Sequence, residues 1–302
     1  MAVAKMKWKE CPGWGRKTLV MGTLNATPDS FSGDGLISAH ATVERALAAA
    51  RAQCEAGADI LDVGGESTRP GADTVDAATE KARILPLITE IRAAIPDILI
   101  SADTYRADVA EAALDAGADI VNDVWALRAD PDMAPMLAER NAAVVLMHNR
   151  SRPNDILSDG RLGTEYVGAD YAHVIEDVSR ALIQCVEEAL DAGIDRGRIA
   201  VDPGIGFGKT VTQNLALLGH LRRLKSHVGL PVLIGPSRKS FVGRVLDTPV
   251  EDRLEGTAAA VASSVMNGAD IVRVHDVREM ARVVRMIDAV KSAPADGKES
   301  PE

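Results

Sequence analysis

The sequence is poor in aromatic residues, which make up only 3% of its 302 positions. A core with so few large rings has to be built from Ala, Val, Leu and Ile, and hydrophobic residues reach 46% in total. Aliphatic side chains of this kind suit helices that pack on a parallel sheet. The composition therefore predicts an α/β protein with a large apolar core.

Cysteine is also scarce. The three cysteines, Cys11, Cys54 and Cys185, are odd in number and have no metal-ligand spacing, which is typical of a reducing compartment. No apolar run is long enough to span a bilayer, and the N-terminus lacks the apolar core of a secretory signal. We therefore expect a cytoplasmic protein without a membrane partner.

Long tracts of positive charge are missing as well. The formal net charge is −10, from 34 Lys and Arg against 44 Asp and Glu. Nucleic acid is bound through many clustered cations, so we expect no nucleic-acid partner. A small anionic ligand is still compatible with this charge, because a local group of Arg and Lys is enough to bind one.

A six-residue pattern is present three times: Gly-Ala-Asp, then two aliphatic residues, then a polar residue. Each copy follows an Ala-rich amphipathic stretch, which is typical of a helix, a glycine stop and a short buried strand. The final polar residues are Asp62, Asn122 and Arg273. They are expected near the carboxyl ends of three strands, where parallel α/β proteins hold their active sites.

Apolar runs alternate with helical periodicity along the whole chain. Eight βα units in series predict an α/β fold of the (β/α)8 TIM barrel type, with the active site at the C-terminal ends of the strands. A doubly wound open sheet would need fewer strands and would not explain polar residues at nearly every strand end. The predicted strands are 18–22, 60–63, 98–102, 120–122, 143–147, 199–201, 232–235 and 271–274. The predicted helices are 40–56, 76–94, 105–116, 132–140, 171–192, 212–227, 252–267 and 277–291.

One barrel domain is expected over residues 15–292. Residues 1–14 are interpreted as an N-terminal extension, and residues 293–302 as a disordered tail. Three connections are longer than usual βα loops and predict substrate-binding loops. They are 25–39, 64–75 and 148–170.

Polar residues follow nearly every predicted strand. Singly, each has a structural explanation: Asp103 as a helix N-cap, His148 as a buried structural histidine, and Asp202 as part of a turn. Their presence at all eight strand ends favours a functional site. The set comprises Asn25, Asp62, Asp103, Asn122, Asp123, His148, Asp202, Lys239, Arg273 and His275.

The chemistry of these residues indicates two halves of a pocket. The carboxylates and the amide suit the edge of a flat, nitrogen-rich heterocycle. A cationic group on the other side suits phosphates, which predicts a ligand with a donor-rich head and an anionic tail. Mg²⁺ held by several carboxylates is the rival interpretation, although the spacing reveals no tight site with His ligands. The cations are Arg69, Arg238, Lys239, Arg273 and His275.

Residues 204–210 (Gly-Ile-Gly-Phe-Gly-Lys-Thr) are similar to a P-loop. A P-loop has four residues between its first glycine and the Gly-Lys pair, whereas this segment has three. The preceding Asp202 also belongs to a strand end. The segment is therefore interpreted as a flexible substrate loop.

Four motifs, taken in this order, resemble the dihydropteroate synthase family over about residues 19–277. They are Asn-Ala-Thr-Pro-Asp-Ser-Phe-Ser at 25–32, Gly-Glu-Ser-Thr-Arg-Pro-Gly at 65–71, Asp-Pro-Gly-Ile-Gly-Phe at 202–207 and Ser-Arg-Lys-Ser-Phe at 237–241. The resemblance implies a TIM barrel, usually a homodimer, that acts in folate biosynthesis and is the target of sulfonamides. It implies condensation of 6-hydroxymethyl-7,8-dihydropterin diphosphate with 4-aminobenzoate, giving 7,8-dihydropteroate and pyrophosphate.

The resemblance also implies roles for single residues. The residues that match the pterin site are Asp103, Asn122, Asp202 and Lys239. Those that match the diphosphate site are Asn25, Arg273 and His275, with Mg²⁺ at Asn25. Those that match the aminobenzoate pocket are Thr68, Arg69, Phe207 and Ser240, and Met147 and Gly235 complete the substrate-binding set. The residues expected to carry the chemistry are Lys239, Arg273, His275 and Asp103.

Two other functions fit part of this pattern. A methyltetrahydrofolate–corrinoid methyltransferase barrel shares the pterin site but needs no diphosphate cluster, and a non-catalytic pterin-binding relative should have lost the cations or the loops. One departure concerns the first loop, where the family usually has Asp-Gly-Gly after the first motif and this chain has Gly33-Asp34-Gly35. No role is therefore assigned to Asp34, and Asp62 is given only a supporting one.

Overall fold

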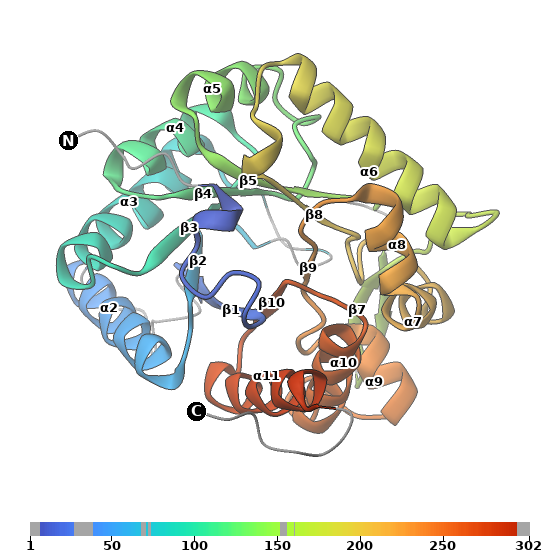
Figure 1. Ribbon diagram of the computed structural model, residues 1–302. Helices are drawn as coiled ribbons and strands as arrows, with labels where there is room; N and C mark the ends of the chain where they lie inside the picture. Colours follow the sequence, from blue (N-terminus) through green and yellow to red (C-terminus); the bar gives the residue numbers. More distant parts are fainter. Residues whose placement is uncertain are drawn as a thin grey trace.

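The computed structural model describes residues 7–26, 39–67, 71, 74–151, 156–159 and 161–294. Parallel strands form a barrel in the order β8-β5-β4-β3-β2-β1-β10-β9, with helices around the outside (Figure 1). A parallel bridge between Val201 and Val232 joins β8 to β9 and closes the ring. The barrel strands are β1 (Leu19–Asn25), β2 (Ile60–Gly64), β3 (Leu99–Asp103), β4 (Ile120–Asp123), β5 (Ala143–Met147), β8 (Ile199–Asp202), β9 (Leu233–Ile234) and β10 (Ile271–Val274).

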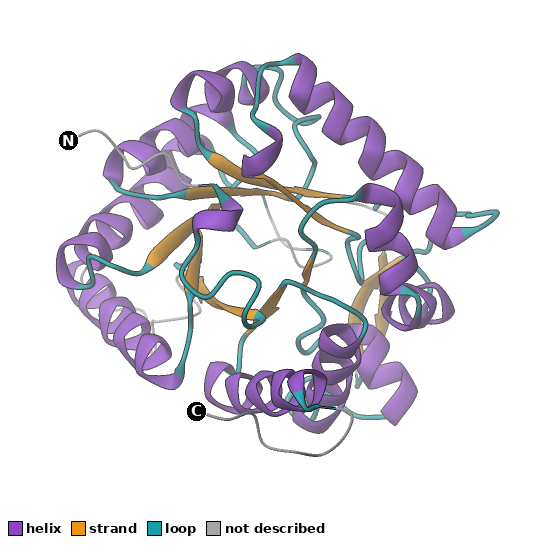
Figure 2. Cartoon of the chain, viewed as in Figure 1, coloured by secondary structure: helices purple, strands orange, loops and turns teal. Residues whose placement is uncertain are grey.

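The prediction of a (β/α)8 barrel is confirmed, and each predicted strand is present within a few residues of its expected ends. The helices cover the outer face of the sheet, and the loops gather at the two open ends of the barrel (Figure 2). The helices are α2 (Ala39–Ala56), α3 (Ala77–Ala94), α4 (Ala107–Ala116), α5 (Met133–Arg140), α6 (Val174–Asp191), α7 (Val211–Gly219), α8 (Leu221–Val228), α9 (Ser240–Leu246), α10 (Leu254–Met266) and α11 (Val277–Ser292).

Three details differ from the sequence-based expectation. The helix predicted over 212–227 is divided into α7 and α8, because His220 has φ −113° and ψ 21°, outside the helical range. The short helix α9 is additional to the eight helices in the predicted set. An antiparallel hairpin of β6 (Ile156–Asp159) and β7 (Gly163–Tyr166) lies inside the long connection after β5.

The core has an inner and an outer layer, because successive side chains of a strand point to opposite faces. On β1, Leu19 and Met21 belong to the cluster inside the barrel, whereas Val20 and Leu24 belong to the cluster between the sheet and the helices. The inner cluster also contains Trp8 from the short 3-10 helix η1 (Trp8–Glu10). Trp8 therefore covers the amino-terminal end of the barrel.

The repeated Gly-Ala-Asp pattern forms the same joint three times. Its glycines, Gly57, Gly117 and Gly268, follow α2, α4 and α10 with φ values of +107°, +115° and +96°. This left-handed conformation is one that glycine adopts without strain, so it ends each helix sharply.

The aspartates of the repeat tie each joint to the neighbouring strand. Each carboxylate accepts a hydrogen bond, at 2.8 to 3.0 Å, from a backbone amide in or directly before the neighbouring strand. Each also forms an ion pair with one basic side chain. The sets are Asp59 with Val20 and Lys17, Asp119 with Ile100 and Arg92, and Asp270 with Val232 and Lys225. The Gly-Ala-Asp part of the repeat therefore has a structural role. It fixes the start of the strand, and the polar residue that follows lies near the carboxyl end of that strand.

No helix in the described part of the chain is long and apolar enough to cross a membrane.

Candidate functional site

The polar strand-end residues meet at the carboxyl end of the barrel. Arg273 on β10 donates from Nε to Oδ2 of Asp62 at 2.6 Å and from Nη2 to Oδ2 of Asp103 at 2.8 Å. Asn122 on β4 donates from Nδ2 to the same oxygen of Asp62 at 3.3 Å. Four residues from four strands thus form one hydrogen-bonded cluster at the mouth.

This geometry corrects the prediction that carboxylates and cations occupy opposite sides. Strand β1 lies between β10 and β2, and the long side chain of Arg273 crosses it to reach the carboxylates. Arg238, predicted to bind phosphate, instead makes a two-pronged ion pair with Asp276 at 2.8 and 2.6 Å. The charges of the mouth are therefore interleaved.

Burial and neighbouring charges shift the pKa values of this cluster. Burial, together with the charge of Asp62, raises the pKa of Asp103 to about 7, while Arg273 opposes the shift. Burial also works against the charge of Arg273, but Asp62 and Asp103 outweigh it and raise its pKa. The guanidinium is therefore a permanent charge, whereas Asp103 titrates near neutral pH.

A row of polar side chains lies beneath the mouth. Thr23, Asp62 and Ser101 are in register on β1, β2 and β3. Thr23 Oγ1, Asp62 Oδ1 and Ser101 Oγ are buried without a hydrogen-bond partner among the described residues. The upper layer of the barrel is therefore polar, unlike the apolar layer below it.

Asp123 does not belong to this cluster, contrary to its place in the predicted carboxylate set. Its two oxygens accept from the backbone amides of Trp125 at 2.8 Å and Leu127 at 2.7 Å. They hold a turn in which Ala126 and Leu127 have φ values of +53° and +65°. The carboxylate therefore stabilises a strained loop through its two backbone contacts.

The other half of the mouth is the loop that follows β8. Asp202 accepts at Oδ1 from the amide of Gly204 at 2.6 Å. Burial raises the pKa of Asp202, while Lys239 opposes the shift. Burial in turn lowers the pKa of Lys239 to about 8, against the effect of Asp202. The charges of Asp202 and Lys239 therefore stabilise each other in a buried site.

Lys209 has a structural role that sequence analysis missed. Its buried ammonium donates to the carbonyls of Gly204 at 2.9 Å and Phe207 at 3.0 Å, and more weakly to that of His148 at 3.5 Å. Burial lowers its pKa to about 7. Lys209 therefore stabilises the loop in which it lies, the segment that is similar to a P-loop. The sequence signal for this role was its position directly after three alternating glycines.

Phe207 forms the wall next to Lys239. The ammonium of Lys239 lies 4.6 Å from the centre of the Phe207 ring and donates to the carbonyl of Ile205. Tyr166 of β7 stacks on the same ring, with centroids 6.0 Å apart. Ser240, the first residue of α9, follows Lys239 directly. Tyr166 was not a predicted site residue, because the hairpin that carries it was not predicted.

The two histidines of the predicted set differ. The His148 ring is buried, and neither nitrogen has a hydrogen-bond partner among the described residues. Burial and the charge of Lys209 lower its pKa to about 2, so the ring is neutral and packs at 6.0 Å from Tyr171. His275 contacts Ser237 Oγ through Nδ1 at 3.0 Å. A structural histidine is normally hydrogen-bonded when buried, so the contacts of the described residues do not match the structural interpretation of His148. His275 is the hydrogen-bonded histidine of the two.

Three further predicted residues lie at strand ends. Asn25 ends β1 beside Gly64, and Met147 is the buried last residue of β5. Gly235 follows β9, and a side chain there would meet Arg273 at 3.7 Å and Lys239 at 4.0 Å. All three therefore border the mouth.

Thr68 and Arg69, Asp34 and most of the 25–32 motif lie outside the described residues, as does nearly all of the predicted tail.

The described side chains at the mouth offer few ligands for a metal ion. Among them, no three His, Cys, Asp or Glu residues are grouped as a metal site would require. Asn25 offers one amide oxygen at the rim. Mg²⁺ is commonly held by one or two protein oxygens together with substrate phosphates, so this donor set fits a metal that arrives with a phosphorylated substrate.

Comparison with known proteins identifies relatives over most of the chain. Residues 21–275 match the family model of pterin binding enzymes. Over 274 residues the chain is 45% identical to the dihydropteroate synthase of Bacillus subtilis, covering 91% of this chain and 89% of that protein.

Solved structures agree with this match. The dihydropteroate synthase of Clostridium difficile, solved with pteroic acid, has a TM-score of 0.82 and 41% identity over 92% of this chain and 98% of that one. The enzyme of Xanthomonas albilineans, solved with 4-aminobenzoic acid, has a TM-score of 0.82 and 39% identity over 92% and 94%.

Proposed function

The chain belongs to the pterin-binding enzymes, in the branch of the dihydropteroate synthases, and on that premise we propose how its barrel mouth works. The reaction joins 6-hydroxymethyl-7,8-dihydropterin diphosphate to 4-aminobenzoate and releases pyrophosphate. The observation that carries the proposal is the contact of Arg273 with Asp62 and Asp103 at the mouth. It places a permanent cation beside the groups that would hold the pterin.

The pterin head binds to the carboxylates and the amide. Its amino group and its ring N–H groups are hydrogen-bond donors, and Asp103, Asp202 and Asn122 supply acceptors from three strands. Lys239 donates to the ring from the side of Asp202. Because these groups are buried, the hydrogen bonds compete little with water and fix the plane of the ring.

The diphosphate binds on the side of Arg273. Nε and Nη2 of this arginine donate to Asp62 and Asp103, and Nη1 donates to a phosphate oxygen of the substrate. His275 and Asn25 border the same side. When the C–O bond to the diphosphate breaks, the leaving oxygen takes the electron pair, and the Arg273 charge stabilises it.

The pterin methylene becomes electron-poor in that step. The negative charges of Asp103 and Asp202 offset the positive charge that spreads into the ring. The amine of 4-aminobenzoate then forms the new C–N bond and releases one proton. Phe207 and Ser240 line the side from which it approaches, with Thr68 and Arg69 assigned to the same pocket, and their part is to orient the amine.

Mg²⁺ is proposed as the cofactor. Asn25 would hold it together with the diphosphate oxygens, and the bound ion would supply further neutralisation of the leaving group. Magnesium titration in the presence and absence of the pterin diphosphate tests this. Binding that is equally tight without the diphosphate would contradict a metal that arrives with the substrate.

A coupled assay tests the reaction. Purified protein is supplied with the pterin diphosphate, 4-aminobenzoate and Mg²⁺, and both pyrophosphate and dihydropteroate are measured. Product formation that requires 4-aminobenzoate supports the synthase, and competition by a sulfonamide supports a shared aminobenzoate site. Well-folded protein without aminobenzoate-dependent turnover would favour the methyltransferase-like or non-catalytic alternatives.

A homodimer located in the cytoplasm completes the proposal. Exposed apolar side chains lie on α7, α9 and α10, which pack against one another, and such patches commonly mark protein interfaces. Sedimentation velocity tests this assembly: Leu246→Glu should dissociate the dimer, and a monomeric wild type would contradict it. The exposed residues are Leu215, Val245, Leu246 and Met266.

A further inference from the structure

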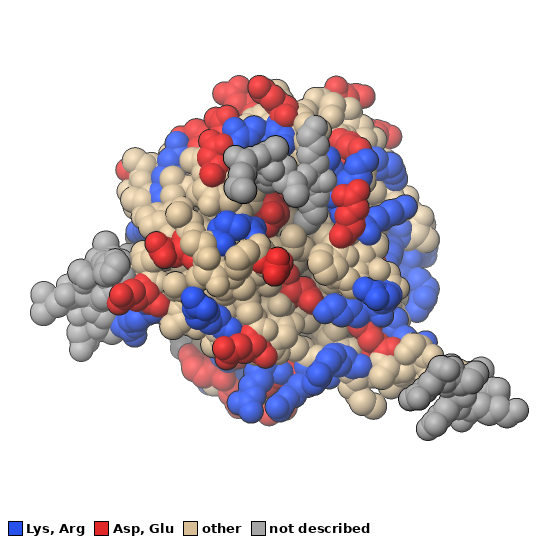
Figure 3. Space-filling view, turned by 60° about the vertical axis from the view of Figure 1, so that its left-hand side comes forward, with Lys and Arg blue, Asp and Glu red and all other residues tan. Residues whose placement is uncertain are grey.

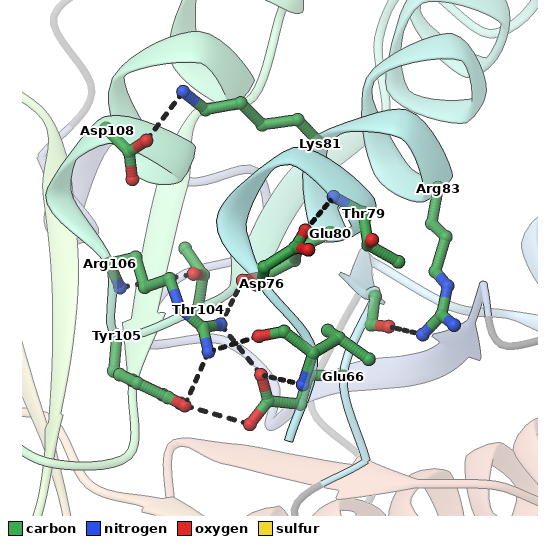
Figure 4. Close-up of polar contacts among 12 residues, drawn as sticks. Glu66, Asp76, Thr79, Glu80, Lys81, Arg83, Thr104, Tyr105, Arg106 and Asp108 are labelled. Carbon is green, nitrogen blue, oxygen red and sulfur yellow. Dashed lines mark hydrogen bonds and ion pairs between the residues drawn. The ribbon is translucent and has the colours of Figure 1, made fainter. Parts of the chain in front are cut away.

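Arg106, just before α4, joins two loops of the barrel mouth. Its Nη1 donates to Oε2 of Glu66 at 2.7 Å and also to Glu80 of α3. Its Nη2 donates to the carbonyl of Val75 at 2.7 Å and to the hydroxyl of Tyr105 at 2.9 Å (Figure 4). One guanidinium thus binds the β2–α3 connection, helix α3 and the β3–α4 connection.

The contacts of Glu66 close this network. The Tyr105 hydroxyl donates to Oε1 of Glu66 at 2.9 Å, and the amide of Val75 lies 3.5 Å from Oε2. Arg83 of α3 donates to the carbonyl of Gly65 at 2.7 Å. The segment 66–75 is therefore held at both its beginning and its end, chiefly by Arg106.

The network is buried, which makes its hydrogen bonds costly to lose. Glu80 is only 1% exposed, and Glu66 and Arg106 are largely shielded. Removing one partner from such a set leaves an unpaired buried charge. A second ion pair, which is exposed to solvent, joins α3 to α4. Lys81 of α3 and Asp108 of α4 lie 2.8 Å apart with side chains 31% and 58% exposed. Pairs of that kind contribute little.

We propose that Arg106 is a positioning residue for 4-aminobenzoate. The inference rests on the proposed function, because the segment 66–75 carries Thr68 and Arg69, which the family resemblance assigns to the aminobenzoate pocket. Holding both ends of a segment narrows the range of conformations between them. Asp103, three residues before Arg106, binds the pterin in the proposal. The network therefore fixes Glu66 and Val75, the two ends of that segment, relative to the strand that ends at Asp103.

Steady-state kinetics separate positioning from general damage. In Arg106→Gln, the KM for 4-aminobenzoate is expected to rise about tenfold or more, with a smaller loss in kcat. Calorimetric affinity for the pterin diphosphate should stay within about twofold of wild type. Tyr105→Phe removes one hydroxyl and should raise the same KM about two- to fivefold. Arg106→Lys should recover only part of the loss, because lysine lacks the fork that reaches several acceptors.

Lys81→Gln is the matched control, because it removes an ion pair between α3 and α4 without touching the network. Its two KM values should equal those of wild type within about twofold. Equal KM values in Arg106→Gln and wild type would overturn the proposal, and so would equal losses for both substrates. If Arg106→Gln fails to fold, Tyr105→Phe decides by the same criteria.

Hydrogen exchange gives a readout that does not need turnover. The peptide spanning residues 65–76 should exchange faster in Arg106→Gln than in wild type or Lys81→Gln, while β3 stays protected. An inactive wild type would defeat the proposed function alone. An unchanged exchange rate in this peptide would defeat the role of Arg106 alone.

Discussion

Arg273 is the residue on which the charge balance of the mouth depends. Asp62 is fully buried, and its Oδ2 accepts from both Arg273 and Asn122. Asp103 shares the same guanidinium. A single cation therefore neutralises two buried carboxylates and, in the proposed reaction, also faces the diphosphate. These two roles explain why Arg273, which was predicted to bind phosphate, is found among carboxylates.

Arg273→Met tests this balance through stability. The substitution leaves two buried carboxylates unpaired, so the free energy of unfolding at neutral pH should fall by about 3–5 kcal/mol. Part of the loss should return in acid, where the carboxylates accept protons. Urea unfolding at several pH values measures both effects. An unfolding free energy equal to that of wild type at neutral pH would show that the pair contributes nothing.

The titration of Asp103 predicts a pH dependence of pterin binding. Its pKa is raised to about 7, and the ionised form is the one that accepts hydrogen bonds from the pterin. The affinity for 6-hydroxymethyl-7,8-dihydropterin, which has no titrating phosphate, should therefore rise roughly tenfold from about pH 6 to about pH 8. Calorimetry of wild type and Asp103→Asn tests this. A profile with the same slope in both proteins would remove Asp103 as its cause.

The same shift affects the protein without ligand. Between about pH 4 and about pH 7 the folded state holds a proton that the unfolded chain releases. The contribution of Asp103 to the free energy of unfolding should therefore fall as the pH rises across that window. Binding of the pterin donors would then offset the cost of ionising Asp103.

At the scale of secondary structure, the barrel was predictable because its strands are short, continuous and apolar. Gly57, Gly117 and Gly268 end their helices sharply, and buried strands follow. These are local signals that a single sequence contains. The hairpin β6–β7 lacked them, because its side chains are exposed or half-buried rather than alternately apolar.

The site was predictable only to the level of the strand end. The positions of Asp62, Asp103 and Arg273 follow from the strands that carry them. The direction of the Arg273 side chain does not, because it depends on the carboxylates that it meets across β1. The role of Asp123 in the following turn could not be predicted either. It depends on contacts with backbone amides that are brought near by an unusual backbone conformation.

The hairpin β6–β7 is docked on the loop that carries Lys239. Arg244 of α9 donates to Asp159 at 3.1 Å and to Glu165 at 3.2 Å. The buried Arg253 donates to the carbonyls of Leu162 at 2.7 Å and Arg238 at 3.0 Å. These contacts fix the end of β7, where the aromatic ring that stacks on Phe207 is located.

Tyr166→Ala should therefore weaken aminobenzoate binding by freeing Phe207. An aromatic pair of this kind contributes about 0.5–1.5 kcal/mol, so the KM for 4-aminobenzoate should rise about two- to tenfold while pterin affinity is kept. Tyr166→Phe retains the ring and serves as the control. Initial-rate kinetics measure the difference. Identical KM values for Tyr166→Ala and Tyr166→Phe would argue against the stacking role.

At the scale of the whole molecule, the two ends of the barrel differ. The carboxyl end carries the interleaved charges of the mouth, and acidic and basic side chains also alternate over the face shown in Figure 3. The amino end is closed by an apolar residue, Trp8, whose indole donates to the carbonyl of Arg198 at 2.9 Å. Arg198 directly precedes β8, whose pairing with β9 is the single bridge between Val201 and Val232.

Trp8 is thus placed to stabilise the weakest closure of the barrel, far from the chemistry. It is 1% exposed, and Trp8→Ala should lower the free energy of unfolding by about 3–5 kcal/mol. Trp8→Phe keeps a ring but loses the hydrogen bond and should cost about 1 kcal/mol. Urea unfolding measures both, and hydrogen exchange should reveal the earliest loss of protection in β8 and β9. Because the mouth is at the other end, kcat below the unfolding transition should be unchanged. A large fall in kcat with normal stability would instead mean that the two ends of the barrel are coupled.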